Sequence, residues 1–516
     1  MKLEIARRLF QQFDPDEALG VDDQQLYSAR SAAIADRFLR ELRFSTGHRF
    51  LLVGARGSGK STELARLYHT MQRRASQGDI RRTTILLDLS RQFWVQRLGA
   101  GQVLFLVALA ILRAALAASG GQARDWLSGP GETLGHTLER AYLAIVDGAE
   151  ALDIADLLEQ LAIVTPAATD EHPAANRRRS PGSPASGAAR DRFILPGRSK
   201  ILAPGDGGTR ALHQALREVL AVARATAGHQ PFLVLVDGLD RVAETDLPFV
   251  QLDRQPVVQL ASRLDTHLAS HGPSTLDAGH HLAELFAPGI LSAPGFPDID
   301  LVYTAPPCLA GSHGLAALGS LGGPDLGRDF RALRLGLFNI VRRDGGRDQD
   351  EIEAMRSLLD RRVNAAGLRS NAVWPGGDLR HPSIDRIIEQ SGGLPRDLVQ
   401  LVRRAVVRSD PAHKRLQVAD LEASNRERAR EYLLRIDLDI ERLLLETWQS
   451  QQRPGDPSGK PLVSRLQADN LILSYTNGRA WFLPHPMVMP ILRERFPAEF
   501  ERLAGPSHGR RQDGYG

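Results

Sequence analysis

A glycine-rich stretch with one lysine and three hydroxyl residues follows a short apolar run near residue 50. Its spacing, Gly54-x-x-x-x-Gly59-Lys60-Ser61, fits the phosphate-loop pattern G-x-x-x-x-G-K-[ST]. The glycines let peptide N–H groups approach phosphate oxygens, Lys60 supplies a charge for the β- and γ-phosphates, and the Ser61 hydroxyl is placed to ligate Mg²⁺. The residues predicted to bind the nucleotide are Gly54, Ala55, Arg56, Gly57, Ser58, Gly59, Lys60, Ser61 and Thr62. The stretch therefore predicts a nucleoside triphosphate site, with ATP and Mg²⁺ as the expected cofactors.

A second stretch with catalytic residue types runs from Phe232 to Asp240 and reads FLVLVDGLD. It is an apolar run that ends in acid, and Asp237 is placed to hold Mg²⁺ through water. Gly238 follows, at the position where many ATPases carry the glutamate that activates water. Asp240 is the nearest substitute for that base, although it could equally be a helix N-cap. We therefore expect slow hydrolysis.

Two further polar residues stand at the ends of apolar patterns. Thr304 ends a β-branched run that begins at Ile299, and from there it would face the γ-phosphate. Arg396 lies in the first turn of a helix predicted within Ser391 to Ala405. The helix dipole disfavours a cation there by about 0.3–1 kcal/mol, so we expect a nucleotide phosphate to compensate. The alternative is a solvated surface arginine.

The elements that position these residues alternate between strand and helix patterns. The predicted strands are Phe50 to Val53, Thr83 to Asp88, Phe232 to Asp237, Ile299 to Thr304 and Leu333 to Val341. The predicted helices between them are Ser61 to His69, Val103 to Ala118, Gly131 to Ala162 and Arg210 to Ala227. Long crossovers between short strands predict an α/β fold and, with the phosphate loop, a P-loop NTPase parallel sheet with helices on both faces. We expect a helical lid and a winged-helix domain to follow it.

The composition of the 516 residues is that of an ordinary globular chain, with 42% hydrophobic residues and a net charge of +4. This charge does not by itself indicate a nucleic acid partner. One cysteine, Cys308, excludes an internal disulfide, and a cytoplasmic location is the simplest expectation. The apolar run from Val103 to Ala118 is shorter than a bilayer span and is interrupted by Arg113, so we expect a buried helix and no membrane partner.

Composition shifts along the chain predict five regions. An N-terminal segment, 1–48, leads into an ATPase core, 49–345, which contains a probable disordered insertion at 165–200. A helical lid, 346–435, a winged-helix-like domain, 436–503, and a disordered tail, 504–516, follow. In the first region Tyr27 and Arg30 could cover the base, although an ordinary helix start is the simpler interpretation. The insertion could instead be a basic arm that reaches for a partner.

The last region is predicted to hold a β-hairpin. The runs Leu471 to Tyr475 and Ala480 to Leu483 flank Asn477-Gly478, which is a strong hairpin signal. Helices followed by such a hairpin indicate a winged helix, which binds a duplex or docks a protein. Arg465 and Arg479 are available for phosphates, but the region lacks a dense basic stripe. We expect His485 to have a structural role.

Together the segments GARGSGKST, FLVLVDGLD, LVYTAPP and SGGLPRDL resemble those of bacterial P-loop ATPases of the STAND and AAA+ type, including the KAP-type ATPases. The Gly393-Leu394-Pro395 turn is similar to the lid motif of STAND proteins and of Orc/Cdc6-like initiators. The resemblance implies a role for each matching residue: Lys60 and Ser61 for phosphate and Mg²⁺, Asp237 as the Walker B acid, Asp240 as the second acid, Thr304 as a sensor and Arg396 as a lid sensor.

These observations predict a slowly hydrolysing ATPase that works as a nucleotide-dependent switch. The resemblance implies a protein effector or regulator as partner, nucleotide-dependent assembly of several copies, and a bacterial defence or signalling system as the setting. The alternative is an ATP-gated DNA-binding protein of the initiator or loader kind, whose winged helix contacts nucleic acid. A kinase is a third alternative, which the lid motif and the C-terminal hairpin disfavour.

Overall fold

The structure is a computed structural model of the chain. It describes residues 3–14, 38–42, 46–78, 82–95, 98–149, 151–165, 194–200, 202, 206–227, 230–240, 296, 298–306, 330–454, 462–475 and 480–503. Several predictions lie outside these residues: the contacts of Tyr27 and Arg30, most of the 165–200 insertion, the Asn477-Gly478 turn with Arg479, and the tail. They stay predictions, as does a role for the Arg465 side chain.

The chain divides into two compact units, which are described separately. The sheet unit comprises Ile34–Val53 and Leu64–Leu333, and the C-terminal unit comprises Met1–Ala33, Gly54–Glu63 and Arg334–Gly516. The phosphate loop therefore belongs to the C-terminal unit, although the strand before it and most of the helix after it belong to the sheet unit. The five predicted domain boundaries stay a prediction.

A six-stranded sheet in the order β4-β2-β6-β7-β1-β8 forms the centre of the sheet unit. Its strands are β1 (Arg49–Val53), β2 (Thr83–Asp88), β4 (Ile163–Val164), β6 (Phe232–Asp237), β7 (Ile299–Ala305) and β8 (Arg331–Arg334). The pairs β2–β6, β6–β7 and β7–β1 are parallel, and among the strand pairs described for this sheet only the edge pair β2–β4 is antiparallel. The predicted α/β class with a parallel core is confirmed.

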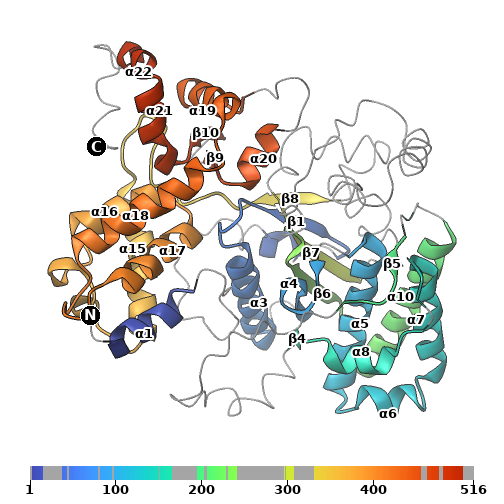
Figure 1. Cartoon of the computed structure of the whole chain (residues 1–516). Helices are drawn as coiled ribbons and strands as arrows, with labels where there is room; N and C mark the ends of the chain where they lie inside the picture. Colours follow the sequence, from blue (N-terminus) through green and yellow to red (C-terminus); the bar gives the residue numbers. More distant parts are fainter. Residues whose placement is uncertain are drawn as a thin grey trace. The chain divides into compact units, whose positions relative to one another are not determined.

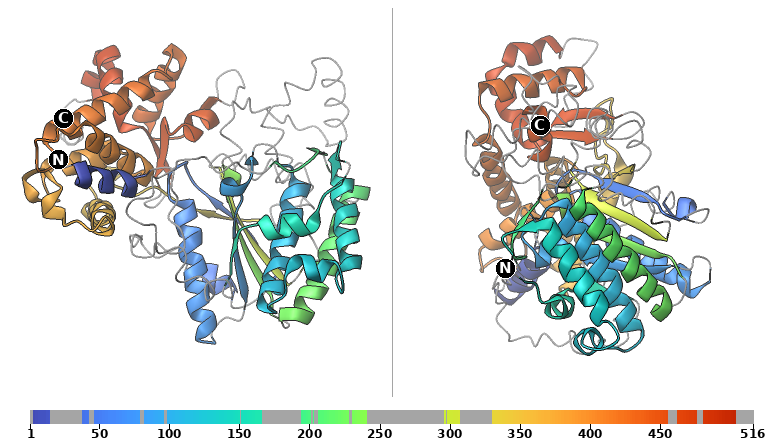
Figure 2. Two further views of the ribbon diagram at one scale, coloured as in Figure 1. Left: turned by 60° about the horizontal axis from the view of Figure 1, so that its bottom comes forward. Right: turned by 90° about the vertical axis from the view of Figure 1, so that its right-hand side faces the viewer.

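Helices cover both faces of this sheet, as the long crossovers require. Figures 1 and 2 show α3 (Lys60–Ser76) on one face, and α5 (Ala100–Ala118) and α10 (Gly207–Ala227) on the other. The other helices of the unit among the described residues are α4 (Leu89–Gln92), α6 (Ala123–Leu127), α7 (Glu132–Ile145) and α8 (Ile154–Gln160). The β2, β6, β7 and β1 register brings the carboxyl ends of these strands to one edge of the sheet.

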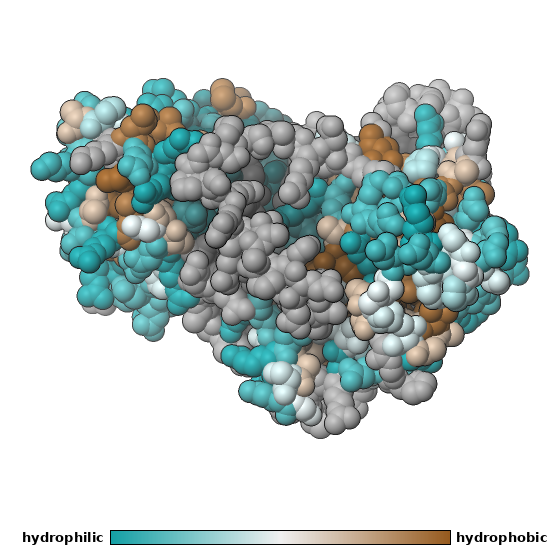
Figure 3. Space-filling model, turned by 90° about the horizontal axis from the view of Figure 1, so that it is seen from below, coloured by the Kyte–Doolittle hydropathy of each residue, from teal (hydrophilic) through white to brown (hydrophobic). Residues whose placement is uncertain are grey.

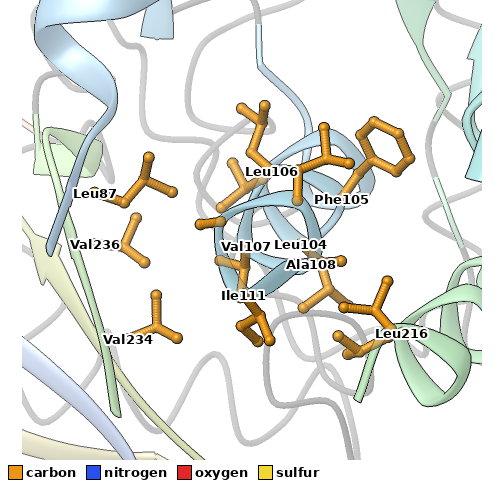
Figure 4. Packing of buried hydrophobic residues seen from close by; sticks show 14 of the residues in the cluster. Leu87, Leu104, Phe105, Leu106, Val107, Ala108, Ile111, Leu216, Val234 and Val236 are labelled. Carbon is orange, nitrogen blue, oxygen red and sulfur yellow. The ribbon is translucent and has the colours of Figure 1, made fainter. Parts of the chain in front are cut away.

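The helix α5 forms the centre of the hydrophobic core. Its mean hydropathy is 2.1, and 89% of it is buried, so it is long and apolar enough to cross a membrane but packs inside the fold. Figure 4 shows its side chains between the sheet residues Leu87, Val234 and Val236 and Leu216 of α10. Because both sides of the helix are covered, its sequence is apolar all round rather than on one stripe.

Two predicted elements were wrong in extent. The helix predicted from Gly131 to Ala162 is two helices, because α7 ends at Ile145 and α8 begins at Ile154. Between them lies the short strand β3 (Val146–Asp147), which pairs with β5 (Arg198–Ser199). The strand predicted from Leu333 to Val341 ends at Arg334. Beyond it, Leu337, Phe338, Ile340 and Val341 are buried in the core of the C-terminal unit, so their apolar pattern reflects that core and not the sheet.

The amino end of β7 carries a buried ion pair. The Asp300 carboxylate is fully buried; it receives the Arg82 Nε at 2.6 Å and the His48 backbone N–H at 2.8 Å. Arg82 also donates to the Leu42 carbonyl at 2.9 Å. A buried charge pair of this kind persists only when hydrogen bonds satisfy both partners, as they do here.

The C-terminal unit is mainly helical. Its helices are α1 (Leu3–Gln12), α15 (Gln349–Ala365), η6 (Ser370–Ala372), η7 (Pro375–Gly377), α16 (Pro382–Gln390), α17 (Pro395–Arg408), α18 (Val418–Leu433), α19 (Leu438–Ser450), α20 (Leu462–Ala468), η9 (Pro486–Val488), α21 (Met489–Arg495) and α22 (Pro497–Leu503). The strands β9 (Ile472–Tyr475) and β10 (Trp481–Pro484) pair antiparallel, which confirms the two strands of the predicted hairpin. One hydrophobic core unites α1, the helices α15 to α18 and this hairpin.

The surface seen in Figure 3 is mainly hydrophilic where the structure describes it, and its hydrophobic residues lie in small separate groups. The largest buried side chains, among them Trp374, Trp481 and Tyr303, lie in the two hydrophobic cores. Burial of this apolar area is the main stabilising contribution to each unit.

Candidate phosphate site and its surroundings

The phosphate loop connects the end of β1 to the start of α3 at Lys60. The Lys60 side chain is 4% exposed, and its ammonium group donates to the carbonyls of Gly54 at 2.8 Å and Ala55 at 2.9 Å. The charged group therefore lies across the backbone of its own loop. Ser61 and Thr62 occupy the first turn of the 17-residue helix α3, whose N–H groups favour an anion.

Three glycines of the loop are required by its shape. Gly57 and Gly59 have φ angles of +78° and +93°, which residues with a Cβ rarely adopt. Glycine is needed at position 54 for a different reason, because a Cβ there would lie 2.7 Å from the Ser58 hydroxyl and 2.9 Å from the Leu335 carbonyl. The backbone thus has the compact form that a phosphate cradle needs.

Arg396, which the sequence singled out, lies against this loop within the C-terminal unit. Its backbone N–H donates to the Gly57 carbonyl at 3.4 Å. A Cβ added at Gly57 would lie 2.5 Å from the Cβ of Arg396. The first turn of α17 therefore packs directly on the glycine at the centre of the loop. The Arg396 side chain leaves the backbone at this point of contact.

A second residue on the loop was missed by the sequence analysis. Asn470, which is 7% exposed, donates from its Nδ2 to the Arg56 carbonyl at 3.1 Å. It stands between α20 and β9 with φ +60°. The only sequence signal was a polar residue at the start of the predicted hairpin, which does not indicate a contact more than four hundred positions away.

The turn Gly392–Gly393 connects α16 to α17 and fits closely against its neighbours. Both glycines have positive φ angles, 63° and 77°. A Cβ at Gly393 would lie 2.0 Å from the Phe338 carbonyl, and Tyr475 of β9 donates its hydroxyl to the Gly392 carbonyl at 3.0 Å. The lid motif predicted from the sequence is thus held by the hairpin and by the segment that follows the sheet.

A buried polar cluster follows Arg396 directly. The Asp397 carboxylate, 2% exposed, receives Arg428 Nη2 at 2.9 Å and the Tyr432 hydroxyl at 2.6 Å, and His485 Nε2 faces it at 3.3 Å. Burial raises the pKa of Asp397, but the hydrogen bond from His485 and the Arg428 charge outweigh it, so the pKa lies below its usual range. The carboxylate is therefore ionised and joins α17, α18 and the segment after β10.

His485 is neutral in this cluster. Its Nδ1 accepts the Met487 backbone N–H at 3.2 Å while its Nε2 faces Asp397, which assigns the proton to Nε2. Burial lowers the pKa of His485, and the Asp397 carboxylate only partly opposes this effect. The ring also stacks on Tyr432, with centroids 4.3 Å apart. The expected structural role of His485 fits this geometry.

In the sheet unit, Asp237 and Thr304 meet at the carboxyl ends of β6 and β7. The Gly238 N–H donates to Asp237 Oδ1 at 2.8 Å and to Thr304 Oγ1 at 2.9 Å. Asp237 is 5% exposed and Thr304 is fully buried. The peptide after the acid thus holds both side chains in one arrangement.

The same geometry explains why no glutamate follows Asp237. Gly238 has φ +97°, and a Cβ there would lie 2.7 Å from both the backbone nitrogen and the Cβ of Ser90. Ser90 in turn donates to Asp88, which is paired in register with Asp237 and caps α4. Asp240 lies two residues after Gly238. It is half-buried and is the last residue of the described segment 230–240.

Comparisons with known proteins include distant matches among the solved structures. No family model matches the chain, and no curated protein does. Among solved structures, the Walker-type ATPase PABY2304 of Pyrococcus abyssi is 14% identical, with a TM-score of 0.41, over 93% of this chain and 99% of that one. The Aeropyrum pernix ORC1 protein in complex with DNA is 12% identical, with a TM-score of 0.36, over 95% and 98%. Likenesses at this level do not identify a family or a function.

Proposed function

We propose that this chain is an ATP-binding, slowly hydrolysing P-loop ATPase that acts as a nucleotide-dependent conformational switch. The observation that carries the proposal is the double contact on the phosphate loop: the lid helix at Gly57 and the hairpin segment at Arg56. A ligand that binds this loop binds next to two elements of the C-terminal unit. If these two elements move, the ligand binds the two conformations with different free energies, and this difference shifts the equilibrium between them.

The residues present suit a nucleotide with Mg²⁺. The loop offers positive-φ glycines, a buried lysine and a helix N-terminus. Ser61 and Asp237 would hold the ion, which supplies charge neutralisation on the phosphates when it is bound. Lys60 would leave the carbonyls of Gly54 and Ala55 for a phosphate, because a charge-assisted bond to an anion is stronger than one to a neutral oxygen.

In this proposal Asp240 orients a water for slow hydrolysis, Thr304 senses the γ-phosphate, and Arg396 reports it to the lid. The likeness to STAND and AAA+ ATPases supports a protein effector or regulator as partner, assembly of several copies, and a bacterial cytoplasmic setting. The β9–β10 hairpin with its helices would be a winged helix that passes the change on.

The test is light scattering of the pure protein with and without ATP and Mg²⁺, repeated with short duplex DNA. The switch predicts nucleotide-dependent assembly without DNA, and a Lys60→Ala variant that stays unchanged by nucleotide. Assembly or ATPase activity that needs DNA would instead support the DNA-binding alternative. No response to nucleotide in either setting would refute both.

A further inference from the structure

We infer that Asn470 is a positioning residue for the phosphate loop, and that through it the C-terminal hairpin segment tunes nucleotide affinity. The inference rests on the proposed nucleotide-binding function and adds to it a residue that touches neither phosphate nor metal. It starts from the 3.1 Å hydrogen bond between Asn470 Nδ2 and the Arg56 carbonyl.

The backbone at Asn470 accounts for the residue type but not for the direction of its side chain. Asn470 follows α20, and the N–H of Leu471 closes the helix end on the Leu466 carbonyl at 2.8 Å. A left-handed residue is common at such a position, and asparagine adopts it more readily than most. Glycine would serve the helix end equally well, so the amide group is available for another purpose.

The amide of Asn470 is committed to the loop. Its Oδ1 has no hydrogen-bond partner among the described residues, so within this part of the chain the side chain makes its hydrogen bond to Arg56. The residue is 7% exposed, and a buried amide is costly unless it gains a hydrogen bond. The hydrogen bond is therefore a buried tertiary contact and not an incidental contact between exposed side chains.

The bond fixes one peptide plane of the phosphate loop. In a trans peptide the N–H of the next residue points opposite to the carbonyl, so the Gly57 N–H points away from Asn470. The next carbonyl, that of Gly57, receives the Arg396 N–H at 3.4 Å. Two successive carbonyls are thus turned outward by protein donors, which leaves the loop's glycine-rich backbone ordered before an anion arrives.

One strand joins the two contacts. Asn470 lies just before β9, and Tyr475 at the end of β9 holds the Gly392 carbonyl, three residues before α17 begins at Pro395. Figure 1 shows β9 between α20 and β10 in this unit. A movement of β9 therefore acts on Arg56 through Asn470 and on Gly57 through the turn and Arg396. By linkage, a nucleotide that prefers the ordered loop must also stabilise β9.

The experiment compares MgADP binding by isothermal titration for the full-length wild type, Asn470→Gly and Asn470→Asp. Glycine keeps the backbone angle and removes the donor without adding charge, whereas aspartate keeps the shape and removes the donor. A net hydrogen bond of this kind corresponds to about three- to tenfold in affinity, so both variants should bind MgADP about that much more weakly. The matched control is Asn364→Asp, since Asn364 donates only to Asp360 within α15 among the contacts described, and it should bind as the wild type does.

A second measurement separates positioning from mere stability. MgADP should slow amide hydrogen exchange of β9 in the wild type, and this protection should disappear in Asn470→Gly even if that variant melts at the wild-type temperature. Wild-type affinity and undiminished protection in both Asn470 variants would overturn the inference while leaving the proposed function intact. If the wild type itself binds no MgADP, the proposed function fails and the inference fails with it.

Discussion

Replacing Asp397 by asparagine should destabilise the C-terminal unit far more than breaking a surface ion pair. The carboxylate is 2% exposed, and three donors converge on it: Arg428, Tyr432 and His485. Asparagine has almost the same shape but replaces one acceptor oxygen by an NH₂ group, which must face one of these donors. Arg428, which is largely buried, then loses its buried carboxylate partner and keeps only the more exposed Glu431, 2.7 Å away.

Removing one partner of a buried ion pair costs about 3–5 kcal/mol. With a urea slope of about 2 kcal/mol/M, that loss lowers the unfolding midpoint by roughly 1.5–2.5 M. Tryptophan fluorescence reports this transition, because Trp374, Trp448 and Trp481 all belong to the C-terminal unit. The measurement is the unfolding free energy extrapolated to water for wild type and variant.

The control is Arg408→Gln, which breaks the ion pair between Arg408 and Glu427. Their nitrogen and oxygen are 2.8 Å apart, but the side chains are 46% and 42% exposed. Water screens such a pair, so its loss should cost about 0–1 kcal/mol. If Asp397→Asn costs no more than this control, the Asp397 cluster does not join the lid to the hairpin segment as described.

The remaining predictions concern the nucleotide site and acid stability. Lys60→Ala should abolish ATP binding measured by titration calorimetry, and unchanged affinity would remove the basis of the proposed function. Asp240→Asn should slow hydrolysis about 10²–10⁴-fold while sparing ATP binding; full activity would place the base elsewhere. Gly57→Ala should weaken ATP binding, because its φ is +78° and its new Cβ would clash with Arg396. Lowering the pH from 7 to 5 should lower the unfolding free energy by up to roughly 1.4 kcal/mol per pH unit through His485, whose folded pKa lies below the unfolded value near 6.5, so that the unfolded chain binds the proton first. Urea titrations of wild type and His485→Gln check this, and an equal slope in both would contradict it.

The local patterns of the sequence predicted most of the sheet. The strands at Thr83–Asp88 and Phe232–Asp237 have the predicted limits, because a fully buried parallel strand is a short continuous apolar run bounded by polar residues. The same rule failed at Leu333 to Val341, where the apolar residues belong to another core. Burial has the same sequence signature whichever core a residue joins.

The candidate site was predictable only where its residues follow a contiguous motif. The loop from Gly54 to Thr62 needs fixed spacing because one backbone turn must wrap one phosphate chain. Asn470 and the partners of Asp397 come from segments far apart in the chain, and a single asparagine or histidine in a helical region has many ordinary roles. Their significance comes from tertiary packing, which periodicity does not encode.

The buried helix α5 has a consequence for how the chain is made. Two of the elements that cover it, β6 and α10, come later in the sequence than α5 itself, whereas β2 precedes it. At about 5–20 residues per second, the roughly 110 residues from Ala118 to Ala227 take about 5–20 s to synthesise. During that interval the ribosome presents an apolar helix that β6 and α10 do not yet cover. Chaperones and membrane-targeting factors then compete with the protein's own later segments for this helix, and slower translation of the residues after α5 should increase aggregation or mistargeting.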